Sequence, residues 1–445
     1  MFALSGRSLT NCEGLSRRSL LRIGALGLGG LSLADVLRLR ADAATSASGS
    51  SSMPRTSVIF FEMAGGPTHF ETYDPKPQAP IEYRGPLDSI DTVLPGVQFS
   101  ELMVEQAKIA DKLAVIRSIH HDNSSHGTSS HLTQTGYYLR NNQNRENEMP
   151  SFGSIAARVH GPNSPGMPSY VSLPRATRYG TATWLGKSYN PFVVDGDPNQ
   201  SDFRVNNLSV EGDLSLGRIG NRRQLLDSLD AQKRMLDNDG VSAAFDSFTR
   251  QAFEMLTSDQ ARQAFDLSQE SESTRDQYGR NTTGQSLLLA RRLVEAGVTF
   301  VTVRLNDSWD DHTNIAQRMQ AKGPNFDRGI AALVRDIYAR GLDEQVLVVS
   351  MGEFGRTPRV NRSGGRDHWG SLMSIMLSGG GLKVGQIVGA SSPKGEVPQD
   401  NPYRPENVLA TIYRHLGIDP AMTFNDLTGR PRFVLERREL VRELV

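Results

Sequence analysis

The stretch Gln345-Val346-Leu347-Val348-Val349-Ser350 contains an uninterrupted apolar run that is rich in β-branched residues. Continuous hydrophobicity over a short stretch is typical of a strand buried on both faces, because a half-exposed strand alternates apolar and polar residues. Three further stretches have the same character, and they are residues 57–61, 112–116 and 298–303. The sequence therefore predicts a sheet of buried, mainly parallel strands.

Helical patterns precede two of these strands. Before the strand at 345–350, apolar residues recur with helical spacing and Gly341 ends the pattern; these residues are Ile330, Leu333, Val334 and Ile337. A similar pattern over 288–297 precedes the strand at 298–303. Helices that alternate with strands predict an α/β fold, a three-layer sandwich with a mainly parallel sheet covered on both faces. Residues 221–271 carry many charges and no strand-like run, so we expect a helical insertion there.

The first 43 residues have the features of an export signal. Arg17 and Arg18 precede a glycine-rich apolar run, 23–31, that is too short to span a bilayer. Two adjacent arginines before such a run are the pattern of a twin-arginine signal, and Ala41-Asp42-Ala43 offers a site for signal peptidase. This predicts export to the periplasm or cell envelope. We expect the signal at 1–43, a linker at 44–54, the folded domain at 55–435 and a C-terminal tail at 436–445.

The composition of the chain argues against some kinds of partner and limits the possible metal ligands. The chain has 49 basic and 49 acidic residues and no dense block of lysine and arginine, which argues against a nucleic-acid partner. Its single cysteine, Cys12, lies in the predicted signal, so a metal in the mature chain must be held by other side chains. No stretch after the signal approaches the roughly 20 apolar residues that a transmembrane helix needs.

Side chains of the metal-ligand type follow three of the predicted strands. The carboxyl ends of parallel strands meet at one edge of a sheet, so the groups that follow them are expected to lie close together. Each cluster alone is also compatible with an ordinary polar turn, but histidine and carboxylate together suit Zn²⁺ or Mn²⁺. Their joint placement favours a shared site for one or two divalent metal ions. The candidate ligands are His69, Glu71, Asp310, Asp311, His312, Glu353, Asp367 and His368.

A fourth polar region, residues 118–137, follows the predicted strand at 112–116 and contains four histidines. It could supply a nucleophile, a base and metal ligands. The alternative is the polar N-terminus of a helix, with its serines and threonines competing as caps, but we favour a functional role.

The motifs resemble a family of exported bacterial proteins of unknown function, placed in the alkaline-phosphatase-like (sulfatase) superfamily. The resemblance covers nearly the whole chain, and it rests on the twin-arginine signal, Gly65-Gly66-Pro67-Thr68-His69 with Asp74-Pro75-Lys76-Pro77, Trp309-Asp310-Asp311-His312, Glu353-Phe354-Gly355-Arg356-Thr357-Pro358 and Gly365-Arg366-Asp367-His368-Trp369. It implies metals at the strand ends. Asp310 or Asp311 with His312 would form one ligand group, Glu353 a second and Asp367-His368 a third. Thr68, His69 and Glu71 occupy the first strand end.

The resemblance leaves the nucleophile open. When Thr135-Gly136 is laid on the end of the sulfatase motif, His126 falls at the nucleophile position, so no formylglycine precursor is present. A hydroxyl or water could attack instead, or catalysis has been lost. The candidate catalytic residues are His126, Ser124, Thr128 and Thr68.

Together these observations predict an exported, metal-dependent hydrolase of a phosphate or sulfate ester, with a small molecule or a glycan as the substrate. Arg356 or Arg366 would bind the anionic oxygens. The alternative is a non-catalytic envelope protein that uses the same scaffold to bind glycans or a partner.

Overall fold

The computed structural model describes residues 55–205, 255, 258–306 and 308–445. The predicted signal and linker, 1–54, lie outside these ranges, as does most of the predicted helical insertion at 221–271. The described end of that insertion forms α9 (Asp259–Phe265) and a short 3-10 helix (Leu267–Gln269).

An eight-stranded sheet forms the centre of the described domain, in the order β12-β4-β11-β8-β1-β7-β5-β6. Each neighbouring pair is parallel except the two that involve β11, which runs antiparallel to both β4 and β8. The prediction of a mainly parallel sheet is confirmed, and β11 is its exception. The strands are β1 (Ser57–Glu62), β4 (Ala114–Ile119), β5 (Tyr170–Leu173), β6 (Phe192–Val193), β7 (Phe300–Arg304), β8 (Val346–Met351), β11 (Met373–Gly379) and β12 (Gln386–Val388).

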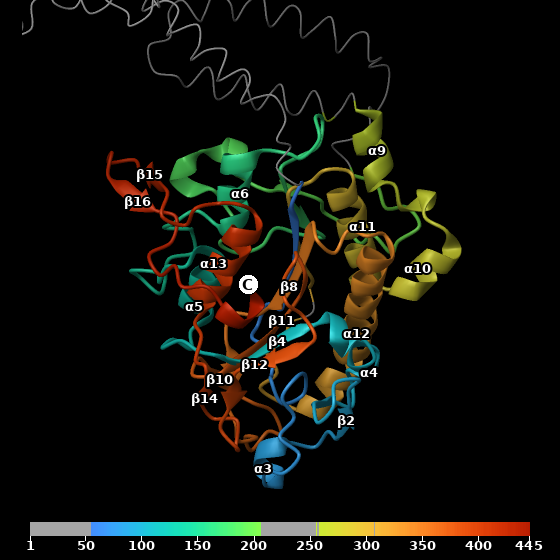
Figure 1. Ribbon diagram of the computed structural model, residues 1–445, viewed down its shortest axis with the longest axis vertical. Helices are drawn as coiled ribbons and strands as arrows, with labels where there is room; N and C mark the ends of the chain where they lie inside the picture. The colour runs from blue at the N-terminus through green and yellow to red at the C-terminus, as the bar shows by residue number, and fades with distance from the viewer. Residues whose placement is uncertain (1–54, 206–254, 256–257, 307) are drawn as a thin grey trace, which may run out of the picture. The chain divides into compact units, whose positions relative to one another are not determined.

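Helices cover both faces of the sheet, which confirms the predicted three layers (Figure 1). One face carries α11 (Thr282–Glu295) and α12 (Ile315–Ala339), and the other carries α6 (Phe152–His160) and α13 (Pro405–His415). The other α-helices in the described ranges, besides α9, are α3 (Ile81–Arg84), α4 (Val104–Ala107), α5 (His126–Thr135) and α10 (Glu272–Tyr278). None of the helices in the described ranges combines the length and apolar character that crossing a bilayer requires.

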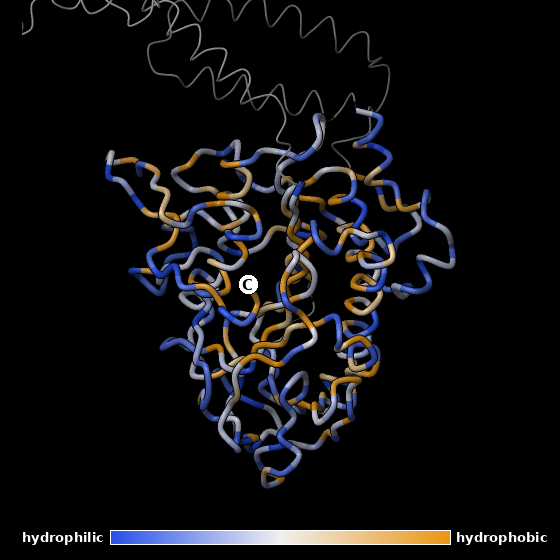
Figure 2. Tube along the Cα trace, viewed as in Figure 1, coloured by the Kyte–Doolittle hydropathy of each residue, from blue (hydrophilic) through white to orange (hydrophobic). Residues whose placement is uncertain are grey.

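Buried apolar side chains form one core on each face of the sheet, and this explains why the strands are continuous apolar runs in the sequence. Successive strand side chains point to opposite faces, so in β1 Ile59 and Phe61 join the core under α11 and α12, while Val58 and Phe60 join the core under α6 and α13. Figure 2 shows the apolar residues gathered along the strands and on the sides of the helices that face them. Val441 and Leu444, in the predicted C-terminal tail, are buried in the second of these cores.

Asp327 of α12 ties the helical layer to α4, because its carboxylate accepts hydrogen bonds from the backbone N–H groups of Glu105 and Gln106 at 2.7 and 2.8 Å. Asp327 is buried, so Asp327→Ala leaves two shielded donors without a partner. We expect this variant to lose about 2 kcal/mol of unfolding free energy in urea titration. Asp327→Asn, which keeps one acceptor oxygen, is expected to lose roughly half as much. Equal stability of wild type and the alanine variant would contradict this role.

Candidate metal centre at the strand ends

The carboxyl ends of β1, β4, β5, β7 and β8 lie at one edge of the sheet, because these strands run in the same direction. The loops that follow them therefore meet. The loop after β4 leads to His126 at the start of α5, and the loop after β7 carries Asp310 and His312. The segment after β8 carries Glu353 and, in the ribbon formed by β9 (Gly355–Arg356) and β10 (His368–Trp369), His368.

Two glycines allow these loops to approach closely. Gly65 has a positive φ, and a Cβ at this position would lie 2.6 Å from the backbone nitrogen of Asp310. A Cβ at Gly66, also with positive φ, would lie 2.4 Å from the ring of Phe354. Only a residue without a side chain fits such contacts, so the Gly-Gly turn after β1 fixes the position of the Asp310 loop.

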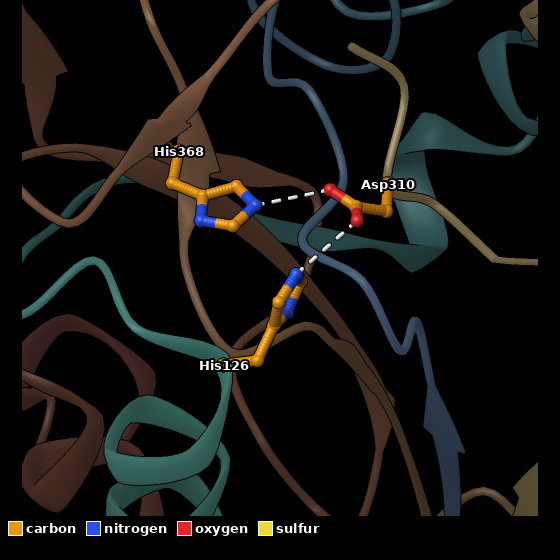
Figure 3. A group of neighbouring side chains, drawn as sticks. All are labelled: His126, Asp310 and His368. Carbon is orange, nitrogen blue, oxygen red and sulfur yellow. Dashed lines mark hydrogen bonds and ion pairs between the residues drawn. The ribbon is translucent and has the colours of Figure 1, made fainter. Parts of the chain in front are cut away.

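Asp310 lies at the centre of three imidazoles. Its Oδ2 is 3.3 Å from Nε2 of His126, and its Oδ1 is 3.0 Å from Nε2 of His368. Figure 3 shows the two imidazoles directed at this carboxylate, with a dashed line for each contact. The same Oδ1 is 2.9 Å from Nε2 of His312. The Nε2 atoms of His312 and His368 are themselves only 3.0 Å apart. We refer to these four residues as the Asp310 cluster.

The Nδ1 atom of each imidazole, which is not the nitrogen facing Asp310, makes its own hydrogen bond to an oxygen. Nδ1 of His126 lies 2.7 Å from Oε1 of Glu353, and Nδ1 of His312 lies 2.7 Å from Oδ1 of Asp367. Nδ1 of His368 lies 2.9 Å from the backbone oxygen of Ser124. Carboxylate and carbonyl oxygens only accept, so each Nδ1 carries the proton and donates it outward. In the neutral rings, all three Nε2 lone pairs therefore converge on the Asp310 carboxylate.

The charges around Asp310 keep it ionised. Burial alone would raise the pKa of Asp310, but the guanidinium of Arg356, 2.6 Å from Oδ1, and His368 hold this pKa well below its usual range. The hydrogen bond to Glu353 raises the pKa of His126, whereas burial lowers the pKa of His368.

This donor set fits a divalent metal ion. Converging lone pairs and a carboxylate repel one another unless a cation lies between them, and outward-donating Nδ1 atoms are what orients metal-ligating histidines. One ligand atom from each of His126, Asp310 and His368 lies within 4.8 Å of the others. Imidazole nitrogen and carboxylate oxygen are ligands of Zn²⁺ and Mn²⁺.

Comparison with known proteins assigns the chain to a family. A family model described as a protein of unknown function (DUF1501) matches residues 55–445. The chain belongs to the DUF1501 family. This match spans the described domain, including every residue of the Asp310 cluster. A search of curated protein sequences found no significant match.

Several solved structures resemble this DUF1501 domain at low identity. The PsFucS1 sulfatase from Pseudoalteromonas sp. aligns over 85% of this chain and 70% of its own, with 11% identity and a TM-score of 0.36. The alkaline phosphatase from the Antarctic bacterium TAB5 aligns over 82% and 98%, with 11% identity and a TM-score of 0.35. The lipoteichoic acid synthase LtaP from Listeria monocytogenes aligns over 88% and 76%, with 8% identity and a TM-score of 0.33.

The DUF1501 fold brings only part of the predicted ligand set to the Asp310 cluster. Asp310, His312 and His368 lie in it, and Glu353 and Asp367 stand behind two of its histidines. Glu353 is further fixed by the backbone N–H of Gly65, which is 2.9 and 3.0 Å from its two oxygens. Asp311 points to α12 instead, where Lys322 lies 2.8 Å away.

The predicted ligands after β1 form a separate buried group. Glu71 pairs with Arg366 at 2.8 Å and also accepts a hydrogen bond from Thr68. Nε2 of His69 lies 3.1 Å from the backbone oxygen of Gly395, and burial lowers the pKa of His69 to about 4. Among the contacts of the described residues, none joins His69 or Glu71 to the Asp310 cluster. We therefore revise the assignment of these two residues as ligands.

The two arginines expected to bind substrate are both fully buried. Arg356 donates to the backbone oxygens of Gly65, Gly66 and Trp309 as well as to Asp310. Arg366 donates to Glu71 and to backbone oxygens of the surrounding loops. Because their N–H donors are hydrogen-bonded within the protein, both arginines stabilise the surrounding loops. We therefore no longer assign them to substrate binding.

The hydroxyl candidates are engaged as well. Thr68 donates to Glu71, and Thr128 donates to the side chain of Asn142. Oγ of Ser124 accepts the backbone N–H of Gly370 at 3.0 Å. His126 begins α5, so the region 118–137 contains both a helix N-terminus and a member of the Asp310 cluster.

A pocket of about 200 Å³ opens beside the Asp310 cluster, and most of its polar lining was not singled out from the sequence. Arg175, Arg178 and Arg304 come from the ends of β5 and β7, and Ser130 lies one turn beyond His126 on α5. Glu62 lies at the end of β1, where burial raises its pKa to about 7. What they share is position, because each ends a strand, lies within five residues of the end of one, or lies one helical turn beyond His126.

Proposed function

We propose that the protein is an exported, metal-dependent hydrolase of phosphate or sulfate esters. The observation that supports this most directly is the convergence of three Nε2 atoms on one carboxylate, beside a polar pocket at the strand ends. A bound zinc or manganese ion would act as a Lewis acid and stabilise the negative charge that develops on the ester oxygens. His126, Asp310, His312 and His368 would hold it.

The cluster has donors for one or two ions. Asp310 offers two oxygens, of which Oδ2 faces His126 and Oδ1 faces His312 and His368. The two oxygens of this carboxylate and the three imidazole nitrogens would hold either one ion or two. Glu353 and Asp367 keep the ligand nitrogens aimed at either arrangement through their hydrogen bonds to the histidines.

We propose water as the attacking group. The hydroxyls of Thr68 and Thr128 donate to Glu71 and Asn142, and a hydroxyl that is held this way is poorly placed to attack an ester in the pocket. Attack by water forms no covalent ester with the protein. Transfer of the phosphoryl or sulfuryl group to an added alcohol such as Tris, which traps covalent intermediates, is then expected to be negligible beside hydrolysis.

Export places this activity in the periplasm or cell envelope. The support is the Arg17-Arg18 pair before the glycine-rich run of 23–31, with Ala41-Asp42-Ala43 as the cleavage site. Esters of small molecules or of glycans would be the substrates available to an enzyme there.

The test is hydrolysis of p-nitrophenyl phosphate and p-nitrophenyl sulfate by the purified protein after incubation with zinc or manganese. We expect one ester to be hydrolysed, and Asp310→Asn to lower kcat/KM by at least about 100-fold, because this carboxylate faces every ligand nitrogen. Protein that binds metal and hydrolyses neither ester nor related sugar esters would favour the alternative, a non-catalytic envelope protein that binds glycans.

A further inference from the structure

We propose that Arg175, Arg178 and Arg304 form an anion-binding subsite that holds the phosphoryl or sulfuryl group beside the Asp310 cluster. The subsite as a place for substrate rests on the proposed function, whereas binding of the free anion does not. The assignment replaces Arg356 and Arg366, whose donors are used inside the protein.

The position of the three arginines supports this assignment. All three line the same pocket as His126, Asp310 and Glu353. They reach it from two neighbouring strands, because β5 pairs with β7 in parallel and both end at this edge. A Cβ on Gly127 would lie 3.6 Å from Nη2 of Arg178, so the Arg178 guanidinium lies against the first turn of α5, next to His126.

Two of the arginines that line the pocket have no carboxylate partner among the described residues. Arg175 and Arg178 are exposed, and no carboxylate in the described part of the chain pairs with either of them. The carboxylates that face the pocket are already occupied. Glu353 accepts from Gly65 and His126, and Asp310 accepts from Arg356. An incoming anion therefore meets unpaired guanidinium groups, which bind tetrahedral oxyanions through paired N–H donors.

Arg304 adds a third positive group to the lining of the pocket. Its only carboxylate contact among the described residues is Glu62, at 3.4 Å, and its Nε has no hydrogen-bond partner within the described structure. Burial raises the pKa of Glu62 to about 7 although Arg304 opposes the shift, so near neutral pH this carboxylate only partly cancels the arginine. The α5 N-terminus also faces this region, and its cap residue Ser125 makes no side-chain cap bond.

The pocket continues away from the Asp310 cluster, which provides room for the rest of a substrate. A second pocket of about 460 Å³ shares Arg175, Leu305 and Asn306 with the first and extends towards Asp195 and Asp197. An ester group held by the arginines would therefore have its organic part on the far side of Arg175. This layout suits a substrate larger than a simple ester, such as a phosphorylated or sulfated sugar.

The experiment measures anion binding rather than turnover. Isothermal titration calorimetry on the full chain, stripped of metal with a chelator and kept at constant ionic strength, would use inorganic phosphate in one arm and inorganic sulfate in the other. We expect Arg175→Gln/Arg178→Gln to weaken binding of at least one anion by at least ten-fold. The matched control is Arg414→Gln/Arg430→Gln, which removes two exposed arginines with no ion pair among the described residues, and it is expected to stay within two-fold of wild type.

The outcomes separate this proposal from the proposed function. Binding of both anions by the Arg175→Gln/Arg178→Gln variant within two-fold of wild type, in folded protein, would overturn the subsite even if the enzyme hydrolyses esters. Wild-type protein that binds neither anion would overturn it too. Anion binding that depends on the two arginines supports the subsite even in a protein without hydrolase activity, and the anion that is lost identifies the ester class.

Discussion

Alanine at both His126 and His368 is expected to leave the protein without bound metal. Each residue contributes one Nε2 donor aimed at Asp310, so the double variant removes two of the three imidazole donors and leaves only His312. Loss of a group that merely orients a ligand costs 10–100-fold in affinity, so loss of two ligands is expected to cost more than about 100-fold. Elemental mass spectrometry on protein purified without chelators would measure the metal-to-protein ratio, with near-stoichiometric zinc or manganese expected in the wild type.

Two variants make this result specific. His120→Ala removes a histidine just after β4 that lies outside the Asp310 cluster, and it is expected to keep the wild-type metal content. Glu353→Gln weakens the support behind His126 and is expected to lower metal affinity by an intermediate factor, about 10–100-fold. If folded wild-type protein contains no metal and takes up none on incubation, the proposal of a metal centre is wrong.

Glu71→Ala is expected to destabilise the protein by about 3–5 kcal/mol. Glu71 and Arg366 are both almost completely buried, and the carboxylate accepts three close contacts from the guanidinium, at 2.8, 3.0 and 3.1 Å. Without Glu71, Arg366 keeps its backbone acceptors but loses its only counter-charge among the described residues. An unpaired buried charge is costly because it has lost its hydration and gains no compensating attraction.

Urea unfolding would measure this loss, and an exposed ion pair provides the comparison. Asp88 lies 4.0 Å from Arg84, and its side chain is 81% exposed, so Asp88→Ala is expected to change stability by less than about 0.5 kcal/mol. Glu71→Gln keeps the shape and an acceptor oxygen and is expected to fall between the two. Stability of Glu71→Ala within about 1 kcal/mol of wild type would mean that Arg366 is not held by this pair.

The layers of the fold were predictable because buried parallel strands have a distinctive composition. Residues 57–61, 298–303 and 345–350 read as continuous apolar runs, and β1, β7 and β8 occupy them with boundaries shifted by one or two residues. The direction of β11 was not predictable in the same way. It depends on the β9–β10 ribbon, which turns the chain back before Met373, and an apolar run carries no direction.

The sequence predicted which loops meet at the site, but it did not predict which side chains of those loops point into it. Asp310 and Asp311 are neighbours of one type, yet one faces three imidazoles and the other faces Lys322, because the loop geometry and not the sequence pattern sets where each points. Arg356 lies in a conspicuous sequence motif, whereas no motif marks Arg175. Burial argues against Arg356 as a substrate-binding residue, because its fully buried guanidinium already donates hydrogen bonds to protein oxygens.

The three histidines and one aspartate that surround the centre come from chain segments that are far apart in sequence. His126 is 184 residues from Asp310, and His368 is 58 residues beyond it. A partly folded chain therefore offers no preformed binding site, and an ion could enter the proposed centre only once β4, β7 and β8 and the segments that follow them have been assembled. Under the proposed twin-arginine export, which carries folded proteins, the cell would fix the identity of the metal by what the cytoplasm supplies at the time of folding and not by what is available at the destination.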